Sequence, residues 1–147
     1  FYPLDRITDW NKLYGKNGFV QFQCVLPLEH SYKGISELLE VTSDQGVASF
    51  LAVLKLFGPQ DFPYSFPMKG YTLALDFPAN KKTFDVLKKL DEITLRNGGR
   101  FYLAKDSRIN DYTFAVSDPR FLKFNCYRKK IGAFERFQSE QSKRLQL

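Results

Sequence analysis

The sequence has few of the residue types on which most catalytic and metal sites depend. It contains one histidine, His30, and two cysteines, Cys24 and Cys126, which lie far apart. A catalytic triad or a histidine-rich metal site is therefore nearly excluded within this chain. The cysteines have neither the spacing of a metal site nor the density of a disulfide framework, so we expect two reduced thiols in a reducing compartment.

Long apolar runs, phosphate-binding glycine loops and a starting methionine are also missing. The longest apolar run, near residues 48–54, is far too short to span a bilayer. The sequence has no glycine-rich loop of the kind that cradles phosphates. Residue 1 is Phe, the single methionine is Met68, and the first residues do not resemble a signal peptide. We expect a fragment of a longer protein rather than a chain trimmed by processing.

Aromatic and basic residues, in contrast, are abundant. The 147 residues suffice for one domain with a buried core. Aromatic side chains make up 16% of the chain, the formal net charge is +6, and the isoelectric point is about 9.3. This balance suits nucleic acid, an anionic membrane surface or an anionic substrate; the alternative is a solvated surface with surplus lysine.

Hydrophobic patterning predicts four β-strands. The second strand is apolar on both faces, which is typical of a strand that is central or well covered. Lys55 is its only charged residue, and it shares a face with Phe57. The strands are expected at residues 19–26, 48–57, 71–77 and 100–105.

Two long amphipathic helices separate these strands. Ser31 is expected to cap the first, which Gly46 ends, and Asn80 is expected to cap the second. The second helix should end in the left-handed manner at Asn97-Gly98-Gly99. The inward residues are expected to be Ile35, Leu38, Leu39 and Thr42 in the first helix and Phe84, Leu87, Leu90 and Ile93 in the second.

The order strand, helix, strand, strand, helix, strand is the ferredoxin-like β-α-β-β-α-β plan. We therefore predict an α+β fold, with a four-stranded antiparallel sheet, helices on one face and additional C-terminal helices. Shorter helices are expected at residues 5–14, 110–117, 119–130 and 138–144.

The second face of the sheet is left to extra segments or to a partner. If the more apolar alternate positions meet the helices, strand parity places three same-face pairs on this open face. They would form a polar patch with one cation, although solvated sheets are often polar on one side. The pairs are Gln21 and Gln23, Lys55 and Phe57, and Thr72 and Ala74.

The fourth strand leads to Lys105, which is flanked by Asp106 and Arg108. A lysine at the mouth of a hydrophobic strand can meet an anionic or electron-rich ligand. Tyr102 and Lys105 are three positions apart, so a regular strand would send them to opposite faces. Either Lys105 lies past the strand end or a β-bulge intervenes.

Several motifs, in order along nearly the whole chain, resemble one family. This is the FAD-dependent decaprenylphosphoryl-β-D-ribose 2′-oxidase family, within the vanillyl-alcohol-oxidase-like flavoproteins and related to the aldonolactone oxidases. The motifs are Phe1-Tyr2-Pro3-Leu4-Asp5, residues 19–23, Leu54-Lys55-Leu56-Phe57-Gly58-Pro59, Ser65-Phe66-Pro67, Leu75-Asp76-Phe77-Pro78, Gly98-Gly99-Arg100, Tyr102, Ala104-Lys105-Asp106-Ser107-Arg108 and Ser142-Lys143-Arg144-Leu145.

The resemblance implies that residues 1–147 are the substrate-binding (cap) domain and that an FAD-binding domain would precede residue 1. It implies oxidation of a sugar hydroxyl, the 2′-hydroxyl of a lipid-phosphate-linked pentose, with hydride transfer to flavin. The basic C-terminal segment would fit approach to an anionic membrane, so the expected location is cytoplasmic or peripheral at the inner face of the membrane. A reductase subunit at the membrane edge is allowed as a further partner.

The resemblance also implies roles for single residues. Lys105 matches the lysine at flavin and substrate and is the expected catalytic residue, where a cation can stabilise negative charge on the reduced flavin. Tyr102 matches a tyrosine at the flavin; both residues are otherwise ordinary features of a strand end. The expected substrate-binding residues are Gln21, Gln23, Lys55, Phe57, Thr72 and Ala74.

Two of these positions depart from the family pattern. Well-known members have a cysteine at the position of Ala74 and an asparagine at that of Thr72, so thiol chemistry is lost at the first and a shorter polar group stands at the second. The loop at residues 58–67 is also one residue shorter than usual. These departures bear on the identity of the substrate more than on the reaction class.

Two other classes of function remain as alternatives. An aldonolactone oxidase would use the same fold on a different substrate. A non-catalytic ferredoxin-like module that binds RNA or a small ligand is less favoured, because the basic, glycine and spaced-aromatic strand motif of RNA-binding domains is absent. We therefore expect no nucleic-acid partner.

Overall fold

A computed structural model describes residues 8–9, 12, 14–60, 62 and 64–147 of the chain. The helix expected at residues 5–14 lies largely outside these residues. The described chain combines one antiparallel sheet with helices, which confirms the predicted α+β fold.

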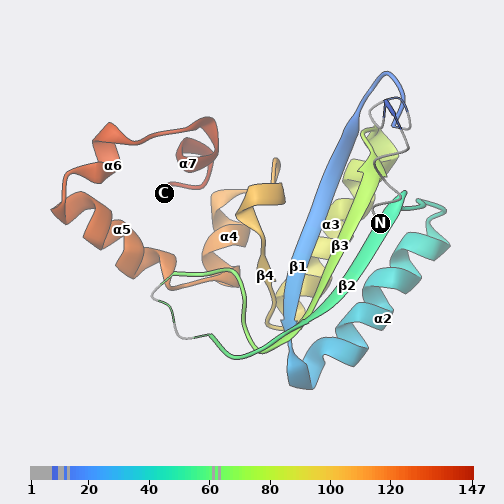
Figure 1. Cartoon of the computed structure of the whole chain (residues 1–147), viewed down its shortest axis with the longest axis horizontal. Helices are drawn as coiled ribbons and strands as arrows, with labels where there is room; N and C mark the ends of the chain where they lie inside the picture. The colour runs from blue at the N-terminus through green and yellow to red at the C-terminus, as the bar shows by residue number, and fades with distance from the viewer. Residues whose placement is uncertain (1–7, 10–11, 13, 61, 63) are drawn as a thin grey trace.

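The sheet has four strands in the order β2-β3-β1-β4 (Figure 1). This is the order of the ferredoxin-like plan, in which the two central strands are the first and third along the chain. The long β1 and β3 pair along their whole length, whereas the very short β4 pairs only with the middle of β1. The strands are β1 (Phe19–Pro27), β2 (Leu51–Phe57), β3 (Gly70–Pro78) and β4 (Arg100–Phe101).

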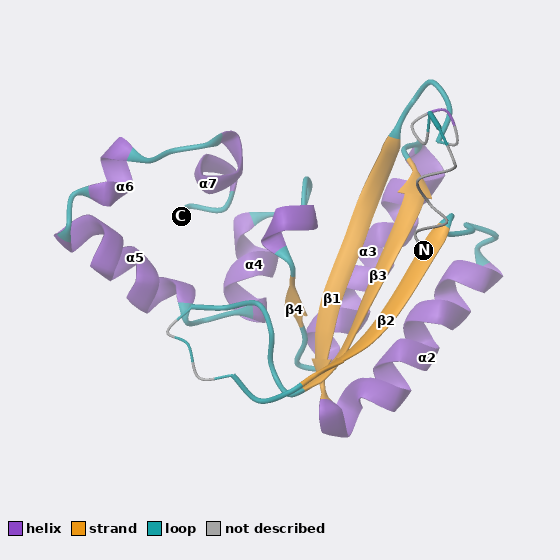
Figure 2. Cartoon of the chain, in the orientation of Figure 1, coloured by secondary structure: helices purple, strands orange, loops and turns teal. Residues whose placement is uncertain are grey.

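Two long helices, α2 (Leu28–Asp44) and α3 (Lys81–Arg96), lie on one face of the sheet (Figure 2). Alternate residues of β1 and β3 point towards them and are almost completely buried. The core between the layers includes Phe22, Cys24, Leu26, Leu73, Leu75 and Phe77 from the strands and Leu38, Val86, Leu87 and Leu90 from the helices.

The C-terminal third extends away from the sheet beyond β4 and then returns (Figure 1). Leu145, near the C-terminus, is only 1% exposed and belongs to the hydrophobic core. The last segment of the described chain is therefore packed against the domain. Its elements are the 3₁₀ turn η2 (Leu103–Lys105), α4 (Asp111–Ser117), α5 (Phe121–Lys130), α6 (Ala133–Arg136) and α7 (Glu140–Arg144).

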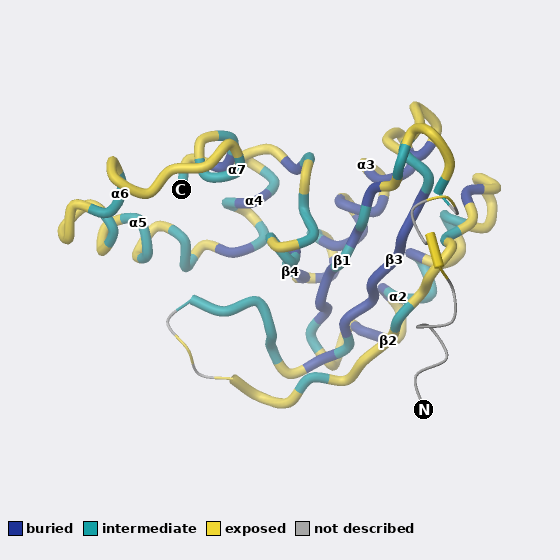
Figure 3. Tube along the Cα trace, turned by 45° about the horizontal axis from the view of Figure 1, so that its top comes forward, coloured by how far each residue is buried: buried dark blue, intermediate teal, exposed yellow. Residues whose placement is uncertain are grey.

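The prediction that the second strand is central or well covered is wrong. β2 lies at the edge of the sheet, and Figure 3 shows its trace as mostly exposed beside the buried β1 and β3. Leu51, Leu54 and Leu56 are 53%, 54% and 60% exposed. An apolar pattern indicates which side chains a strand can bury, but not whether other described residues pack over them.

Two details of the long helices also differ from expectation. Ser31 does not cap α2, which begins three residues earlier, after Pro27. Its buried hydroxyl instead donates to the carbonyl oxygens of Leu26 and Pro27 and accepts the N–H of Tyr71. The inward assignment of Leu39 and Phe84 is wrong, since they are 44% and 39% exposed. On α3 the buried stripe runs through residues 83, 86–87, 90 and 93–94, and Phe84 lies about 100° off it.

The helix-end predictions for α3 are confirmed, since Asn80 accepts the N–H of Thr83 at its start. Asn110 accepts the N–H of Thr113 at the start of α4, a cap that was not predicted. Gly98 follows α3 with a φ of +68°, the left-handed conformation expected there. The short α6 was not predicted.

The fourth strand is much shorter than residues 100–105. β4 ends at Phe101, and Lys105 lies past the strand end, in η2. Of the two explanations left open by the sequence, the end of the strand is therefore the correct one. The regular alternation ceases before Lys105, so Tyr102 and Lys105 are free to face the same space.

Candidate functional site

A groove opens on the sheet face that α2 and α3 leave uncovered. It encloses about 480 Å³ between the ends of β1 and β2, the loop between β2 and β3, and η2. Most of the residues predicted for the site meet here. The lining residues are Gln23, Lys55, Phe57, Ser65, Phe66, Pro67, Tyr102 and Lys105.

Strand register confirms that the three predicted pairs share the open face. Gln23 is opposite Ala74, and Thr72 is opposite Lys55, so these side chains project on the same side of the sheet. Thr72 and Ala74 are 1% and 7% exposed and are not among the residues that line the groove, although Thr72 bonds to Gln23, which does line it. Gln21 lies on the same face, farther along β1 and outside the groove lining.

The amide of Gln23 is held in one orientation. Its Nε2 donates to Thr72 Oγ1 at 3.0 Å, and the Thr72 hydroxyl donates to the carbonyl oxygen of Cys24 at 2.7 Å. Because the single hydroxyl proton is used in that second bond, Thr72 can only accept from Gln23. The side-chain oxygen of Gln23, Oε1, is thereby left to accept a hydrogen bond from a ligand.

Gln21 is oriented in a similar way by Asp76, a residue that the motif analysis did not place in the site. Gln21 Nε2 donates to Asp76 Oδ1 at 2.9 Å, and Tyr14 donates to Oδ2 at 3.2 Å. Burial and the neighbouring carboxylate raise the pKa of Tyr14, which keeps the phenol protonated as a donor. The signal for Asp76 was its parity, since it alternates with Thr72 and Ala74 on β3.

An aromatic wall closes one side of the groove. Phe66 lies edge-on to Phe57, with ring centroids 6.0 Å apart, and 4.7 Å from Tyr102. Arg120 holds this loop by donating to the Ser65 carbonyl oxygen at 2.5 Å while it pairs with Asp118. Sequence reasoning missed Arg120, because a contact across 55 residues leaves no local pattern.

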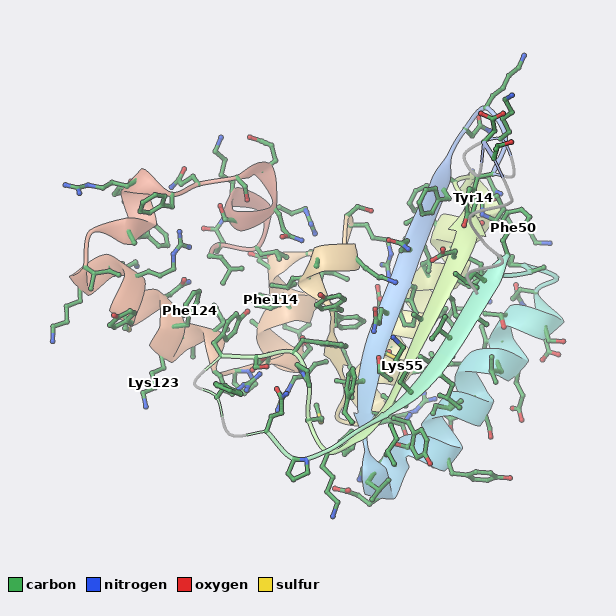
Figure 4. The ribbon with its side chains drawn as sticks, viewed as in Figure 1. Tyr14, Phe50, Lys55, Phe114, Lys123 and Phe124 are labelled. Atoms are coloured by element: carbon green, nitrogen blue, oxygen red, sulfur yellow. The ribbon has the colours of Figure 1, made fainter. Side chains whose placement is uncertain are left out.

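Lys55 and Lys105 bring two ammonium groups to the groove from β2 and η2. Neither forms an ion pair with another residue that the structure describes. Figure 4 shows Lys55 on β2, far from Tyr14 and Phe50 at the opposite end of the sheet. The groove therefore offers two cations and an amide acceptor beside aromatic rings, which can receive a polar ligand with hydroxyl and anionic groups.

The residues of this groove fit the polar edge of a flavin ring better than its diphosphate. The ammonium groups can stabilise negative charge on a ring, and the oriented amide can accept from a ring N–H. The diphosphate of FAD requires a different cradle, typically a glycine-rich loop at a helix N-terminus. The described residues supply no such loop next to the groove.

The cysteines do not belong to the groove. Cys24 points into the core on the helix side, where burial raises the pKa of its thiol to about 12, and Cys126 is exposed on α5. Within the described ranges, no group of histidine, cysteine and acidic side chains is placed to bind a metal ion. In the same part of the chain, every helix is too short or too polar to cross a bilayer.

The fold is an α+β domain with a groove on its open sheet face, and comparison with known proteins relates it to an oxidase. The chain is 38% identical, over 148 aligned residues that cover all of it, to decaprenylphosphoryl-beta-D-ribose oxidase of Mycolicibacterium smegmatis. It is 30% identical over 133 residues, 88% of its length, to a Streptomyces coelicolor protein described as an uncharacterized protein in mprA 5'region.

This whole-chain similarity confirms the resemblance seen in the motifs. The chain spans about a third of each relative, 32% of the first and 36% of the second. No family model matches the chain. The shared region relates residues 1–147 to one part of an oxidase.

Proposed function

We propose that residues 1–147 form the substrate-binding domain of an FAD-dependent oxidoreductase that oxidises a sugar hydroxyl to a ketone. The observation that carries this proposal is the convergence of Gln23, Lys55, Phe57, Tyr102 and Lys105 on one groove. A chain-long similarity to an oxidase of a phosphoribosyl lipid supports it. The FAD is bound mainly by another domain of the same polypeptide, since the described residues supply no cradle for its diphosphate beside the groove.

In this proposal each groove residue has a separate role. Bound FAD supplies the acceptor for the hydride. Lys105 places a positive charge where negative charge develops during the reaction. Tyr102 would contact the flavin ring beside it. The Gln23 carbonyl oxygen accepts from a sugar hydroxyl, and Lys55 meets a phosphate or a further hydroxyl. Phe57 and Phe66 exclude water from one side.

The favoured substrate is a lipid-phosphate-linked pentose, oxidised at the 2′-hydroxyl. The similarity to the mycolicibacterial decaprenylphosphoryl-beta-D-ribose oxidase supports this choice. Exposed Leu122 and Tyr127 on α5 are interspersed with Lys123, Lys129 and Lys130, which suits approach to an anionic membrane from the cytoplasmic side. A reductase subunit at the membrane edge would take the electrons. We propose no nucleic-acid partner.

An aldonolactone-type oxidation is the second candidate. Two positions on the open sheet face favour keeping it, because Thr72 and Ala74 differ from the asparagine and cysteine expected there from the resemblance to sugar-lipid oxidases. Smaller side chains on this face suit a different sugar acid or lactone. The two candidates share Lys105 and differ in substrate.

The test begins with the protein taken from its own source. Native mass spectrometry should find a polypeptide several times longer than residues 1–147 that carries one FAD. Anaerobic mixing with a short-chain polyprenylphosphoryl-β-D-ribose should then bleach the flavin, whereas an aldonolactone precursor should not. A chain near 17.1 kDa without cofactor would sink the proposal.

The Lys105→Met variant of that protein tests the proposed role of the Lys105 ammonium group. Folding and FAD content should be retained, and flavin reduction by the sugar should collapse. Lys89→Met, which removes an exposed lysine on α3, is the matched control and should leave the rate unchanged. Full turnover by Lys105→Met would remove this lysine from the mechanism.

A further inference from the structure

The backbone that carries Lys105 has little local support. η2 is a three-residue 3₁₀ turn, closed by the N–H of Lys105 on the Tyr102 carbonyl oxygen at 3.0 Å and by that of Asp106 on the Leu103 carbonyl oxygen at 3.2 Å. Short 3₁₀ turns have poorer hydrogen-bond geometry than α-helices. The direction of the Lys105 side chain therefore depends on contacts from elsewhere in the chain.

The C-terminal helix α7 supplies those contacts through Gln141. The Gln141 amide donates from Nε2 to the carbonyl oxygen of Leu103 at 2.6 Å and to that of Asp106 at 3.0 Å. These two carbonyls lie on either side of Lys105 in sequence. The single Nε2 of Gln141, with one proton for each carbonyl oxygen, thus bridges the two ends of the turn.

Arg144, one helical turn later, holds the end of the same turn. It donates from NH2 to Asp106 Oδ2 at 2.9 Å and from NH1 to the carbonyl oxygen of Ile109. The second oxygen of Asp106 accepts the N–H groups of Arg108 and Ile109. The Arg144 and Asp106 side chains are 28% and 7% exposed, so this charge-assisted contact is well shielded from water.

α7 acts at the groove only through η2. None of its residues is among those that line the groove. The helix is itself fixed by a capping box between Ser139 and Ser142 and by burial of Leu145 in the core. A rigid element is therefore joined to the catalytic turn across 35–38 residues of sequence.

We propose that α7 is a positioning element for Lys105, in which Gln141 and Arg144 set the turn so that the ammonium group faces the groove. Gln141 and Arg144 are positioning residues, because they touch the backbone and Asp106 rather than a ligand. The inference rests on the proposed role of Lys105 in sugar oxidation. It adds that the C-terminal helix contributes to the reaction rate.

The test uses the complete flavoprotein and a double-mutant cycle. Gln141→Met keeps the length of the side chain and removes both donors. We expect the rate of flavin reduction by polyprenylphosphoryl-β-D-ribose to fall about 10- to 100-fold, the scale of a small misplacement of a catalytic group, with a smaller change in KM. Gln146→Met, at an exposed glutamine whose side chain donates only to the nearby Lys143 carbonyl oxygen, is the control and should change neither.

In a Lys105→Met background, Gln141→Met should change the residual rate less than about twofold, because a residue that acts through another loses its effect when that other is removed. An equal fold-loss in both backgrounds would overturn the proposal and leave Gln141 a stability residue. Should Gln141→Met fail to accumulate as folded protein, Arg144→Lys enters the same cycle, since it keeps the charge but not the two-pronged contact.

A second measurement does not depend on turnover. The rate at which each lysine is acetylated can be read by peptide mass spectrometry. Gln141→Met should change the rate at Lys105 several-fold and leave that at Lys55 unchanged. An unchanged Lys105 rate would overturn the positioning role even if activity fell. If the wild type fails to oxidise any sugar while the Lys105 rate responds, the proposed function fails and the positioning role stands.

Discussion

Arg108 and Asp91 face each other through two parallel hydrogen bonds, NH1 to Oδ2 at 2.5 Å and NH2 to Oδ1 at 2.6 Å. Their side chains are only 15% and 12% exposed. This pair joins the middle of α3 to the segment that follows η2. The pair therefore fixes to α3 the same stretch of chain, residues 106–109, that α7 also holds.

Removing one partner of this shielded pair should cost far more than removing an exposed one. Asp91→Ala leaves a guanidinium without its carboxylate, and we expect a loss of about 3–5 kcal/mol in unfolding free energy. Asp85→Ala, on the same helix, breaks an exposed pair with Lys88 and should leave the melting temperature nearly unchanged. Thermal unfolding measured by circular dichroism compares them; similar midpoints for both variants would contradict the assignment.

Thr72→Val should disturb binding in the groove without opening a cavity. Valine has nearly the shape of threonine but cannot accept from Gln23, so the amide is free to turn its NH2 towards the ligand. We expect kcat/KM for the sugar to fall about tenfold, equal to about 1.4 kcal/mol. Thr72→Ser, which keeps the hydroxyl, should restore most of the value in steady-state assays. Equal losses in both variants would mean that packing, not the hydroxyl, matters.

The two thiols should differ sharply in reactivity. Burial raises the pKa of Cys24 to about 12, so the folded protein holds it as a neutral thiol at pH 8. Iodoacetamide should alkylate Cys126 within minutes and Cys24 only after denaturation, as peptide mass spectrometry would report. In the unfolded chain Cys24 ionises near 9.0, so its contribution to stability is complete below that pH and is lost as pH rises towards 12. Rapid labelling of Cys24 in the native protein would contradict this burial.

Arg120→Met should loosen the aromatic wall. Without its guanidinium, the Ser65 carbonyl loses its shortest donor and the Asp118 carboxylate loses its ion pair. We expect faster cleavage by chymotrypsin after Tyr64 in the same loop and a higher KM for the sugar, because the Phe66 ring no longer stays against Tyr102. Arg136→Met, an exposed arginine on α6, should behave as wild type in the same digestion. Unaltered cleavage in Arg120→Met would show that other contacts hold the loop.

Local patterns were sufficient for much of the fold and for the members of the groove. Alternation located β1 and β3, and an asparagine cap located the start of α3, because both depend on neighbours within a few residues. Parity alone put Gln23, Lys55 and Thr72 on one face. The contributions that were missed come from far along the chain, as in the contact of Gln141 with Leu103. Neither periodicity nor spacing records such a contact.

Ser31 and Lys105 illustrate the same limit at a finer scale. Ser31 has the right identity for a cap, but α2 starts earlier, and the Ser31 hydroxyl bonds to the Leu26 and Pro27 carbonyl oxygens and to the N–H of Tyr71. Lys105 follows a strand-like run, but pairing with β1 stops at Phe101 and the chain turns. Residue identity and alternation alone record neither outcome.

The exposed edge of β2 has a practical consequence for anyone who produces residues 1–147 alone. It offers unpaired backbone groups along a strand whose single charge is Lys55 and whose leucines are more than half exposed. Such an edge recruits further strands from identical molecules. Preparations of the isolated segment are expected to aggregate with concentration, and a second charge on this edge strand, such as one at the exposed Leu54 (Leu54→Lys), is the simplest remedy.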